Sequence, residues 1–281
     1  MSSNAGLVVT KLVGTGNDFL FVDARKDLPG VFGKISRPDI VRQLCDRHFG
    51  IGSDGMVFVE ETKHGYRWDF FNTDGSYAEM CGNATRCFGR WAKSKLGLNE
   101  IEFETLVGQV KVSVEGDEVT SYLDFVKANL KTLKLPIGTR ELTVYLTNTG
   151  VPHFVVPVGK LEEAQVARDI IQSLRFHPEA GPRGANVTFL EVLSTQRFRT
   201  VTFERGVEDF TLSCGTGVLA AAAVGLQTGD SSSLEADVST PGGALKVKFG
   251  PGFSTVWLTG PAIEVFETTL PESVFVQETL A

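Results

Sequence analysis

The sequence predicts an α+β fold in which one structural unit occurs twice. Strand-like segments of alternating or continuous apolar residues are interspersed with a few helical ones, and an apolar helical run follows a Cys-Gly pair in each half. Four motifs recur in the same order at separations of 132 to 135 residues. They pair Gly16 with Gly150, Gly52 with Gly184, Cys81 with Cys214, and residues 104–112 with 239–247. An ordered repeat of this kind indicates a duplicated unit.

In the first copy, residues 6–10 and 19–22 have the pattern of strands. Residues 38–45 fit a short amphipathic helix, with Pro38 near its start. Two further strands, 56–60 and 66–71, flank a turn signal at residues 62–65. The cysteine helix comes next and Gly97 is its expected cap. Residues 101–104, 109–114 and 119–125 then alternate as antiparallel strands do.

The second copy repeats this order. We expect strands at 142–146 and 153–158, a helix over 161–174, and strands at 186–192 and 198–203. The helix after Cys214 follows, and residues 236–238, 244–249 and 254–258 form the closing strands. A linker between the copies is expected near residues 128–139.

Two cysteines stand at the predicted starts of the two central helices. The run at residues 218–226 carries no charge and is apolar on every side, which is typical of a buried helix. A helix N-terminus carries partial positive charge and stabilises a thiolate or a bound carboxylate. Gly82 and Gly215 allow a ligand to approach the backbone closely. In a duplicated protein we expect the two helix starts to face one cleft.

Two thiols at one cleft suggest either a redox pair or two acid/base groups on opposite sides of a substrate. A reaction that removes a proton from one face of a carbon and adds one to the other needs two comparable groups, and one thiolate with one thiol meets that need. The repeat and the adjoining glycines favour a chemical role over a merely structural one for Cys81 and Cys214. Cys45 and Cys87 lie within predicted helices, and we interpret them as small buried apolar residues.

Composition limits the classes of partner. The 281 residues carry a formal net charge of -7, which argues against nucleic acid or an anionic membrane as the main partner. The N-terminal residues lack the pattern of a signal peptide, and four cysteines in a chain of this length do not suggest a disulfide framework. No Cys/His cluster indicates a metal site. We therefore expect a cytoplasmic protein that acts on a small molecule.

Several motifs together resemble the diaminopimelate epimerase family, over roughly residues 11–266. They are Gly16-Asn17-Asp18-Phe19, the stretch 71–76 leading into Cys81-Gly82-Asn83-Ala84-Thr85-Arg86-Cys87, Gly184-Ala185-Asn186-Val187, Glu204-Arg205-Gly206-Val207, Cys214-Gly215-Thr216-Gly217, Pro241-Gly242-Gly243 and Thr259-Gly260-Pro261-Ala262. The two Cys-Gly motifs are specific in combination.

The resemblance implies two pseudo-symmetric domains, each a mixed, mostly antiparallel and barrel-like sheet wrapped around a central helix. It implies residues 1–130 for the first domain, to which a C-terminal strand at about 264–281 returns, and residues 131–263 for the second. It also implies a homodimeric, cofactor-independent epimerase that uses no metal and supplies lysine and peptidoglycan precursors by interconverting LL- and meso-diaminopimelate.

The resemblance also assigns site residues. It implies that Cys81 and Cys214 are the acid/base thiols, and that His153 and Glu204 adjoin them and help to set their protonation. The residues that it implies for substrate binding are Asn17, Asn72, Gly82, Asn83, Asn186, Glu204, Arg205, Gly215 and Thr216. From the residues alone, the sequence favours a satisfied strand-end side chain for His153 and a surface ion pair with Glu204 or Asp209 for Arg205.

The chain departs from the family pattern at three places. Val151 stands where the family usually has Asn, Gly55 stands where Gln usually follows Asp, and residues 207–213 are about one residue longer than usual. Loss of an amide that binds the far end of a substrate costs on the order of 1–3 kcal/mol. A racemase of the same architecture for another amino acid is therefore an alternative, ahead of a phenazine-biosynthesis type isomerase and a non-catalytic binding protein.

Overall fold

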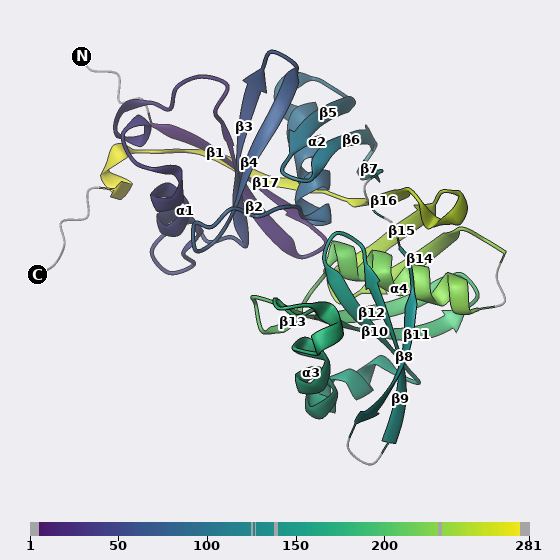
Figure 1. Cartoon of the computed structure of the whole chain (residues 1–281). Helices are drawn as coiled ribbons and strands as arrows, with labels where there is room; N and C mark the ends of the chain where they lie inside the picture. The colour runs from purple at the N-terminus through teal and green to yellow at the C-terminus, as the bar shows by residue number, and fades with distance from the viewer. Residues whose placement is uncertain (1–5, 125, 127, 138–139, 230–231, 276–281) are drawn as a thin grey trace, which may run out of the picture. The chain divides into compact units, whose positions relative to one another are not determined.

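The structure is a computed structural model that describes residues 6–124, 126, 128–137, 140–229 and 232–275 (Figure 1). The chain forms two compact units. The first comprises Met1–Val119 and Ala262–Ala281, and the second comprises Thr120–Pro261. Both contain strands and helices, which confirms the predicted α+β class.

The first unit is built from strands around one long helix. Its elements are β1 (Leu7–Gly14), β2 (Asn17–Asp23), η1 (Gly30–Gly33), α1 (Arg37–Cys45), β3 (Gly55–Thr62), β4 (Gly65–Asn72), α2 (Gly82–Leu96), β5 (Glu100–Thr105), β6 (Gly108–Glu115), the start of β7 (Glu118–Leu123), β17 (Ile263–Leu270) and η5 (Glu272–Phe275).

The second unit has the same plan. Its elements after the end of β7 are β8 (Lys131–Ile137), β9 (Arg140–Asn148), β10 (Pro152–Val158), η2 (Leu161–Val166), α3 (Arg168–Arg175), η3 (Pro178–Ala180), β11 (Asn186–Ser194), β12 (Arg197–Glu204), β13 (Asp209–Thr211), α4 (Gly215–Thr228), β14 (Glu235–Thr240), β15 (Gly243–Phe249), η4 (Pro251–Phe253) and β16 (Val256–Pro261).

Strand pairing follows the same alternation in both units. In the first, β1–β2 is antiparallel, β2–β3 parallel, β3–β4 antiparallel, β4–β5 parallel and β5–β6 antiparallel. In the second, the corresponding pairs are β9–β10, β10–β11, β11–β12, β12–β14 and β14–β15, with the same directions in the same order. The duplicated, mixed and mostly antiparallel sheet is confirmed.

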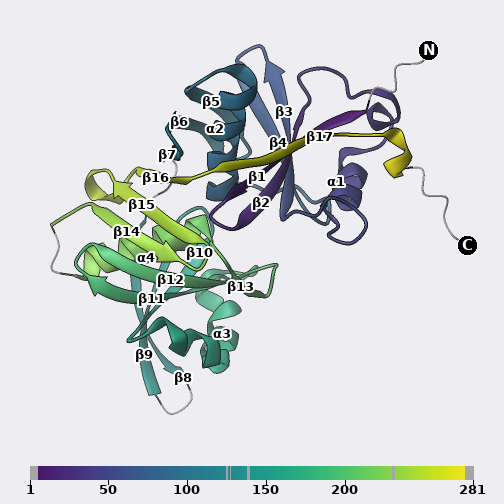
Figure 2. The ribbon, with the colours of Figure 1, turned by 180° about the vertical axis from the view of Figure 1, so that it is seen from behind.

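The C-terminal strand belongs to the first unit. β17 pairs antiparallel with β1 along its length, and the two run side by side in Figure 2. In the second unit β8 pairs antiparallel with β9 in the corresponding way. Each unit therefore has a strand paired in this position. In the first unit it is β17, from the end of the chain, and in the second it is β8, from the middle of the chain.

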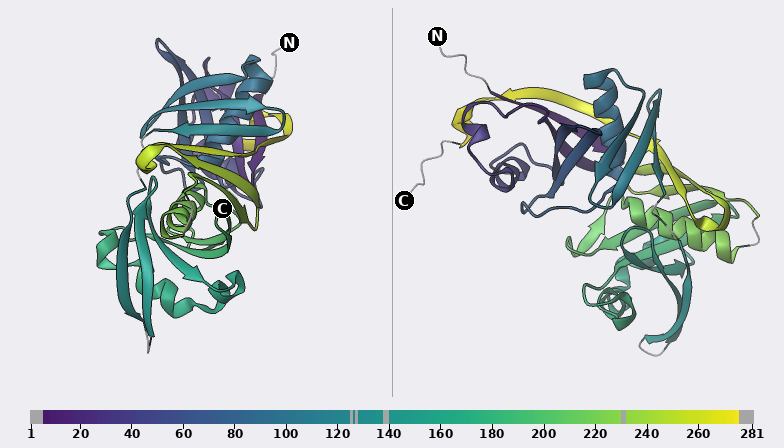
Figure 3. Two further views of the ribbon diagram at one scale, coloured as in Figure 1. Left: turned by 90° about the vertical axis from the view of Figure 1, so that its right-hand side faces the viewer. Right: turned by 45° about the horizontal axis from the view of Figure 1, so that its top comes forward.

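The two long helices are the buried centres of their units, and α4 is seen nearly end-on among strands in the left view of Figure 3. In α2, Phe88 and Trp91 are almost fully buried, and Gly97 ends the helix in the left-handed conformation expected of its cap. In α4, every residue from Gly217 to Leu226 is buried. This confirms that the uncharged run forms an interior helix.

Three local expectations are corrected. The helix predicted over 161–174 is broken at Ala167, which has φ -84° and ψ 42°, into η2 and α3. The stretch expected to be a linker contains β8, because Leu133 and Leu135 pack against the core of the second unit. Pro136 suggested a break, but an outer strand tolerates proline. The short β13 had no signal in the sequence.

Candidate active site

Cys81 occupies the position just before α2. Its backbone is extended, with φ -147° and ψ 119°, and its carbonyl accepts the first helical hydrogen bond from Thr85 at 3.0 Å. Gly82 and Asn83 are therefore the first two residues of the helix. The first N–H groups of a helix have no partner within it, so this end attracts anions.

Cys214 occupies the same position before α4. Its φ and ψ are -114° and 109°, and its carbonyl accepts from the Val218 amide at 2.9 Å. A Cβ atom at Gly217 would lie 2.3 Å from the Thr202 hydroxyl oxygen, so only glycine allows α4 to approach β12 this closely. Gly215 and Thr216 begin the helix, and the Thr216 hydroxyl lies 3.4 Å from the Cys214 sulfur.

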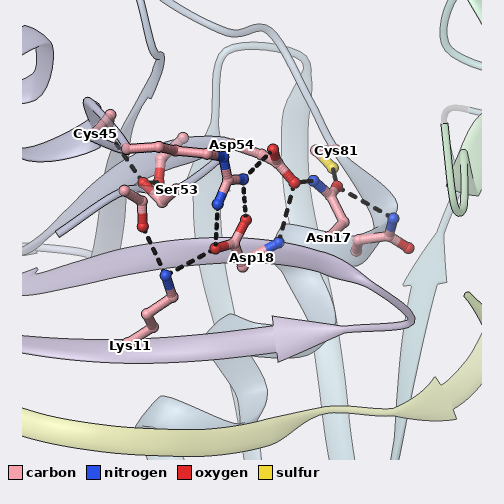
Figure 4. Close-up of polar contacts among 11 residues, drawn as sticks. Lys11, Asn17, Asp18, Cys45, Ser53, Asp54 and Cys81 are labelled. Atoms are coloured by element: carbon pink, nitrogen blue, oxygen red, sulfur yellow. Dashed lines mark hydrogen bonds and ion pairs between the residues drawn. The ribbon is translucent and has the colours of Figure 1, made fainter.

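A tight hairpin turn brings Asn17 beside Cys81. Thr15 and Gly16 both have positive φ, 51° and 82°, and join β1 to β2, where Gly14 pairs with Asn17. The Cys81 sulfur lies 3.7 Å from Asn17 Oδ1, which also accepts from Asn83 Nδ2 at 3.2 Å (Figure 4). Three residues assigned by the resemblance thus meet at one point of the first unit.

Behind this point lies a fully buried arginine. Arg86 donates to the Thr15 hydroxyl at 3.0 Å, to Asn83 Oδ1 at 2.8 Å and to the Gly82 carbonyl at 3.1 Å. Burial lowers the pKa of its guanidinium to about 10, against the attraction of the Cys87 and Cys81 thiols in their ionised form. Arg86 lies within the cysteine motif, but no sequence pattern marks it as buried, because charged side chains are normally exposed.

Asn17 also connects Cys81 to a cluster of charges. Its Nδ2 donates to Asp54 Oδ2 at 2.6 Å, and Arg47 donates to both Asp54 and Asp18 at 2.8 Å (Figure 4). Burial opposes ionisation of Asp18, but hydrogen bonds and charges from Arg47 and Lys11 outweigh it and lower its pKa to about 2. Asp54 was not among the expected site residues, although the repeat pairs its position with that of Asn186.

Asn72 lies at the end of β4, and its Nδ2 donates to the Ser76 hydroxyl at 3.0 Å. Its backbone amide donates to the Ser76 carbonyl at 2.9 Å, which closes a turn ahead of the cysteine loop. Asp74 holds the same turn through the Ser76 amide and hydroxyl. Asn72 is exposed.

In the second unit, His153 is fully buried beside the start of α4. Its Nδ1 lies 2.8 Å from the Thr188 hydroxyl, and its Nε2 lies 2.9 Å from the Thr216 hydroxyl. Burial, assisted by the positive charge of Arg205, lowers the pKa of His153 to about 3. The imidazole is therefore neutral at physiological pH, and it reaches the Cys214 sulfur through the Thr216 hydroxyl.

Asn186 links His153 to the Glu204–Arg205 turn. Its Oδ1 accepts the Arg205 backbone N–H at 2.7 Å, which directs its Nδ2 to His153 Nε2 at 3.2 Å. The Arg205 guanidinium donates to the Gly184 carbonyl at 3.2 Å. Glu204 accepts a hydrogen bond from the Thr211 hydroxyl. Five of the expected residues of this unit are thus joined by hydrogen bonds, namely Cys214, Thr216, His153, Asn186 and Arg205. Glu204 and Gly215 adjoin them in the chain.

The other two cysteines lie in the core, as expected. Cys45 is buried in the last turn of α1, and burial raises the pKa of its thiol to about 11. Cys87 is fully buried inside α2, where burial raises the pKa of its thiol still further. Neither thiol ionises near neutral pH.

Two classes of feature are absent from the residues that the structure describes. No group of three or more His, Cys, Asp or Glu residues there is arranged to hold a metal ion. Within the same residues, no helix is long and apolar enough to span a membrane.

Comparison with known proteins identifies the family. The sequence model named diaminopimelate epimerase matches residues 9–129 and 145–265. This chain belongs to the diaminopimelate epimerase family. Over 276 residues it is 40% identical to the diaminopimelate epimerase of Aquifex aeolicus strain VF5, covering 94% of this chain and 98% of that protein. The Archaeoglobus fulgidus diaminopimelate epimerase is 36% identical over 278 residues, covering 94% and 96%. The chain is therefore an isomerase of the epimerase class.

Solved structures of other enzymes share the fold. A PhzC/PhzF phenazine biosynthesis protein of Clostridium difficile strain 630 matches with a TM-score of 0.69 and 14% identity, over 94% of this chain and 99% of that one. A hydroxyproline epimerase of Agrobacterium vitis matches with a TM-score of 0.65 and 17% identity, over 97% and 94%. At these identities the likeness concerns the fold alone.

Proposed function

We propose that this protein interconverts LL- and meso-diaminopimelate without a cofactor, and that Cys81 and Cys214 are its two acid/base groups. One observation carries the proposal. In a chain of the diaminopimelate epimerase family, the two cysteines cap the equivalent central helices of the two repeated units. The buried Cys45 and Cys87 occupy no such position.

The proposed reaction has two proton transfers. One thiolate removes the α-proton of the substrate and becomes a thiol, while the electron pair of the C–H bond delocalises into the α-carboxylate. The other thiol then donates its proton to the opposite face of the carbon and becomes a thiolate. The product has the inverted configuration, and the enzyme ends with its two cysteines exchanged in protonation. The reverse reaction uses the same groups in exchanged roles.

The helix starts supply the electrostatic part of the proposal. Backbone N–H groups of Gly82 and Asn83 in α2, and of Gly215 and Thr216 in α4, would bind the α-carboxylate. Such fixed dipoles stabilise the negative charge that develops as the proton leaves. They need no reorganisation during the reaction, so their stabilisation is larger than that of water.

The remaining polar residues would bind and orient the substrate. Asn17, Asn72 and Asn186 offer amides for its ammonium and carboxylate groups. Arg205 suits a distal carboxylate, because a guanidinium binds one through two parallel hydrogen bonds. His153 and Glu204 would set the protonation of the thiols, and the connection from His153 to Cys214 through Thr216 supports the first of these roles.

A second candidate is racemisation of a different amino acid, and the packing at Gly55 favours it. A Cβ atom at Gly55 would lie 2.8 Å from the Phe71 carbonyl oxygen and 2.9 Å from the Phe70 ring. A glutamine at this position would therefore not fit the present backbone, and Val151 offers no amide. The far end of the substrate would be bound differently from the usual family pattern.

Isotope exchange separates the two candidates. The protein is incubated in D₂O with LL-diaminopimelate and, in separate reactions, with a panel of L-amino acids. The proposal expects deuterium at the α-carbon of diaminopimelate together with formation of the meso isomer, followed by NMR and chiral chromatography. Exchange confined to another amino acid would establish the second candidate in its place.

We also propose that the protein is a homodimer and works in the cytoplasm on this small molecule, with no nucleic-acid or membrane partner. β17 exposes Ile263, Val265 and Phe266 by 56, 53 and 41%, and such apolar surface favours association with a second copy. None of the four cysteines is in a disulfide, which suits a reducing compartment. Sedimentation equilibrium of the wild type and of Phe266→Glu tests the dimer, since a monomeric wild type would contradict it.

A further inference from the structure

Two asparagine side chains in the first unit join a carboxylate to a guanidinium. The order is Asp54, Asn17, Asn83 and Arg86, with distances of 2.6, 3.2 and 2.8 Å between successive polar atoms. Both amides are arranged head to tail along this line. The Asp54 end is visible in Figure 4, where Asn17 lies between Asp54 and Cys81.

The carboxylate determines which way the Asn17 amide points. An ionised carboxylate can only accept hydrogen bonds, so the atom that meets Asp54 Oδ2 must be the amide nitrogen of Asn17. Asp54 is itself held in place, because its Oδ1 accepts from Arg47 at 2.8 Å and its Oδ2 accepts the Asp18 backbone N–H at 3.2 Å. The opposite end of the Asn17 amide, Oδ1, is thereby turned toward α2.

The guanidinium determines the second amide in the same way. A guanidinium can only donate, so the atom of Asn83 that meets Arg86 at 2.8 Å must be the oxygen. The Asn83 nitrogen then faces Asn17 Oδ1 at 3.2 Å. Arg86 cannot turn away easily, because it is fully buried and also donates to the Thr15 hydroxyl and the Gly82 carbonyl.

The Cys81 sulfur therefore faces an acceptor. Asn17 Oδ1 lies 3.7 Å from it, and an amide oxygen can accept a hydrogen bond from a thiol but offers none to a thiolate. A reversed amide would present its N–H₂ to the sulfur and would favour the thiolate instead. The direction of the Asn17 amide thus biases the protonation of Cys81.

We propose that Asp54 and Arg86 are positioning residues that fix the Asn17 and Asn83 amides so that Cys81 keeps its proton in the free enzyme. The inference rests on the proposed function only in taking Cys81 to be one of the two reacting thiols. It assigns Cys81 the role of the acid at the start of a cycle. The proton on its sulfur can be measured without substrate.

Other charges near Cys81 act on the same equilibrium. On α2, the positive charge of Arg86 attracts a Cys81 thiolate. Cys87 follows Arg86 in the chain, and burial raises the pKa of its thiol. Asp18, Asp54 and Arg47 come from β2 and the loops beside it, and Lys11 comes from β1. The two carboxylates and the two cations compensate one another through their ion pairs. Loss of any one carboxylate would itself favour the thiolate, so a test of positioning needs a control with the same change in charge.

The test measures alkylation of Cys81 by iodoacetamide against pH, with the modified peptide quantified by mass spectrometry. Only the thiolate reacts, so the midpoint of the rate profile reports the ionisation of this thiol. In Asp54→Ala the Asn17 amide is free to reverse, and the midpoint should fall by about half to one pH unit, the equivalent of one hydrogen bond. The Asp54 side chain is 42% exposed, so the truncation should leave the fold intact.

Asp18→Asn is the matched control. It removes one carboxylate charge from the same cluster but leaves Asn17 its acceptor on Asp54. Its midpoint should fall by clearly less than that of Asp54→Ala. Equal shifts in the two variants, or no shift in Asp54→Ala, would overturn the inference.

A second variant covers the case in which Asp54→Ala does not fold. Asp54→Asn keeps the shape of the side chain but can present either end of its amide to Asn17, so it should give a smaller shift in the same direction. An unchanged midpoint in folded Asp54→Asn would contradict the inference in that case. Because the measurement uses no substrate, failure to epimerise diaminopimelate would count against the proposed function and leave this result unaffected.

Discussion

His153 shows how burial sets the chemistry of a single residue. Its imidazole has no exposed surface, both ring nitrogens lie within 2.9 Å of threonine hydroxyls, and its pKa is lowered to about 3. A neutral imidazole can only relay or accept a proton at neutral pH. The ionisations that govern activity near pH 7 should therefore belong to other groups than His153.

The same burial makes stability depend on pH. In the unfolded chain the imidazole of His153 has a pKa of about 6.5, whereas in the native protein its pKa is about 3. Between these two values the unfolded chain binds a proton that the native protein does not bind. The free energy of unfolding therefore falls as pH falls through this window. The slope due to this one group approaches about 1.4 kcal/mol per pH unit. Asp18 acts mostly at lower pH, because its lowered pKa stabilises the fold above about pH 4 and that stability is lost toward pH 2.

Urea unfolding at several pH values between 6.5 and 4 tests this account. His153→Gln should reduce the slope of the unfolding free energy against pH by about 1.4 kcal/mol per pH unit, which corresponds to one proton. This holds whatever the effect of the substitution on stability at pH 7. The same substitution at His64, which is exposed, should leave the wild-type slope. A slope in His153→Gln as steep as that of the wild type would show that His153 titrates normally in the folded protein.

At the scale of single residues, the sequence indicates positions with a repeated motif and misses those that depend on burial. Cys81 and Cys214 could be singled out because each precedes glycine at an equivalent place in the repeat. Arg86 could not, because an arginine in a helix is usually solvated. Asp54 lies in the repeated motif, but its contact with Asn17 has no sequence signal. Arg86 contacts Thr15, 71 residues away, and Asp54 contacts Asn17, 37 residues away, and the tight turn at Thr15 and Gly16 places these two partners together.

Among the elements, β17 and β8 have the same place in different units. β17 pairs with β1 from Leu7↔Leu270 to Val13↔Ile263, and β8 pairs with β9 from Lys131↔Leu146 to Ile137↔Arg140. Only the first of these pairs joins the two ends of the chain. The strand β1 therefore depends on a segment more than 250 residues away, whereas β9 is held by its neighbour in sequence.

Removal of the C-terminal strand should loosen one unit and spare the other. In a protein that ends at Pro261, the β1 amides that pair with β17 should lose most of their protection from hydrogen exchange, because their acceptors are gone. The β9 amides should keep theirs, since β8 remains. Exchange measured by mass spectrometry distinguishes the two, and equal loss of protection in β1 and β9 would show that the units do not fold as separate cooperative blocks.

Element prediction succeeded where the apolar pattern was long and failed where it was short. The uncharged run of α4 and the glycine cap of α2 follow directly from sequence. The break at Ala167 and the three-residue β13 do not, because neither has a glycine, proline or periodic signal of its own. β8 was hidden by Pro136, which interior strands exclude and outer strands accept.

For the whole molecule, duplication is the property that the sequence revealed most clearly. The matched motifs predicted two units of one plan, and the strand directions of the two units agree pair by pair. A duplicated unit places one cysteine at one helix start in each copy. A reaction that inverts a carbon needs two such groups, so duplication and the proposed chemistry fit each other.

Turnover of separate cysteine variants shows whether both cysteines at the helix starts are required for the reaction. Epimerisation of LL-diaminopimelate is followed in the wild type, Cys81→Ala, Cys214→Ala and the control Cys45→Ala, with circular dichroism to verify folding. Each of the first two variants should lose at least about 10²- to 10⁴-fold in rate, the usual contribution of an acid/base group, while Cys45→Ala retains the wild-type rate. Wild-type turnover in a folded Cys81→Ala or Cys214→Ala protein would contradict the account.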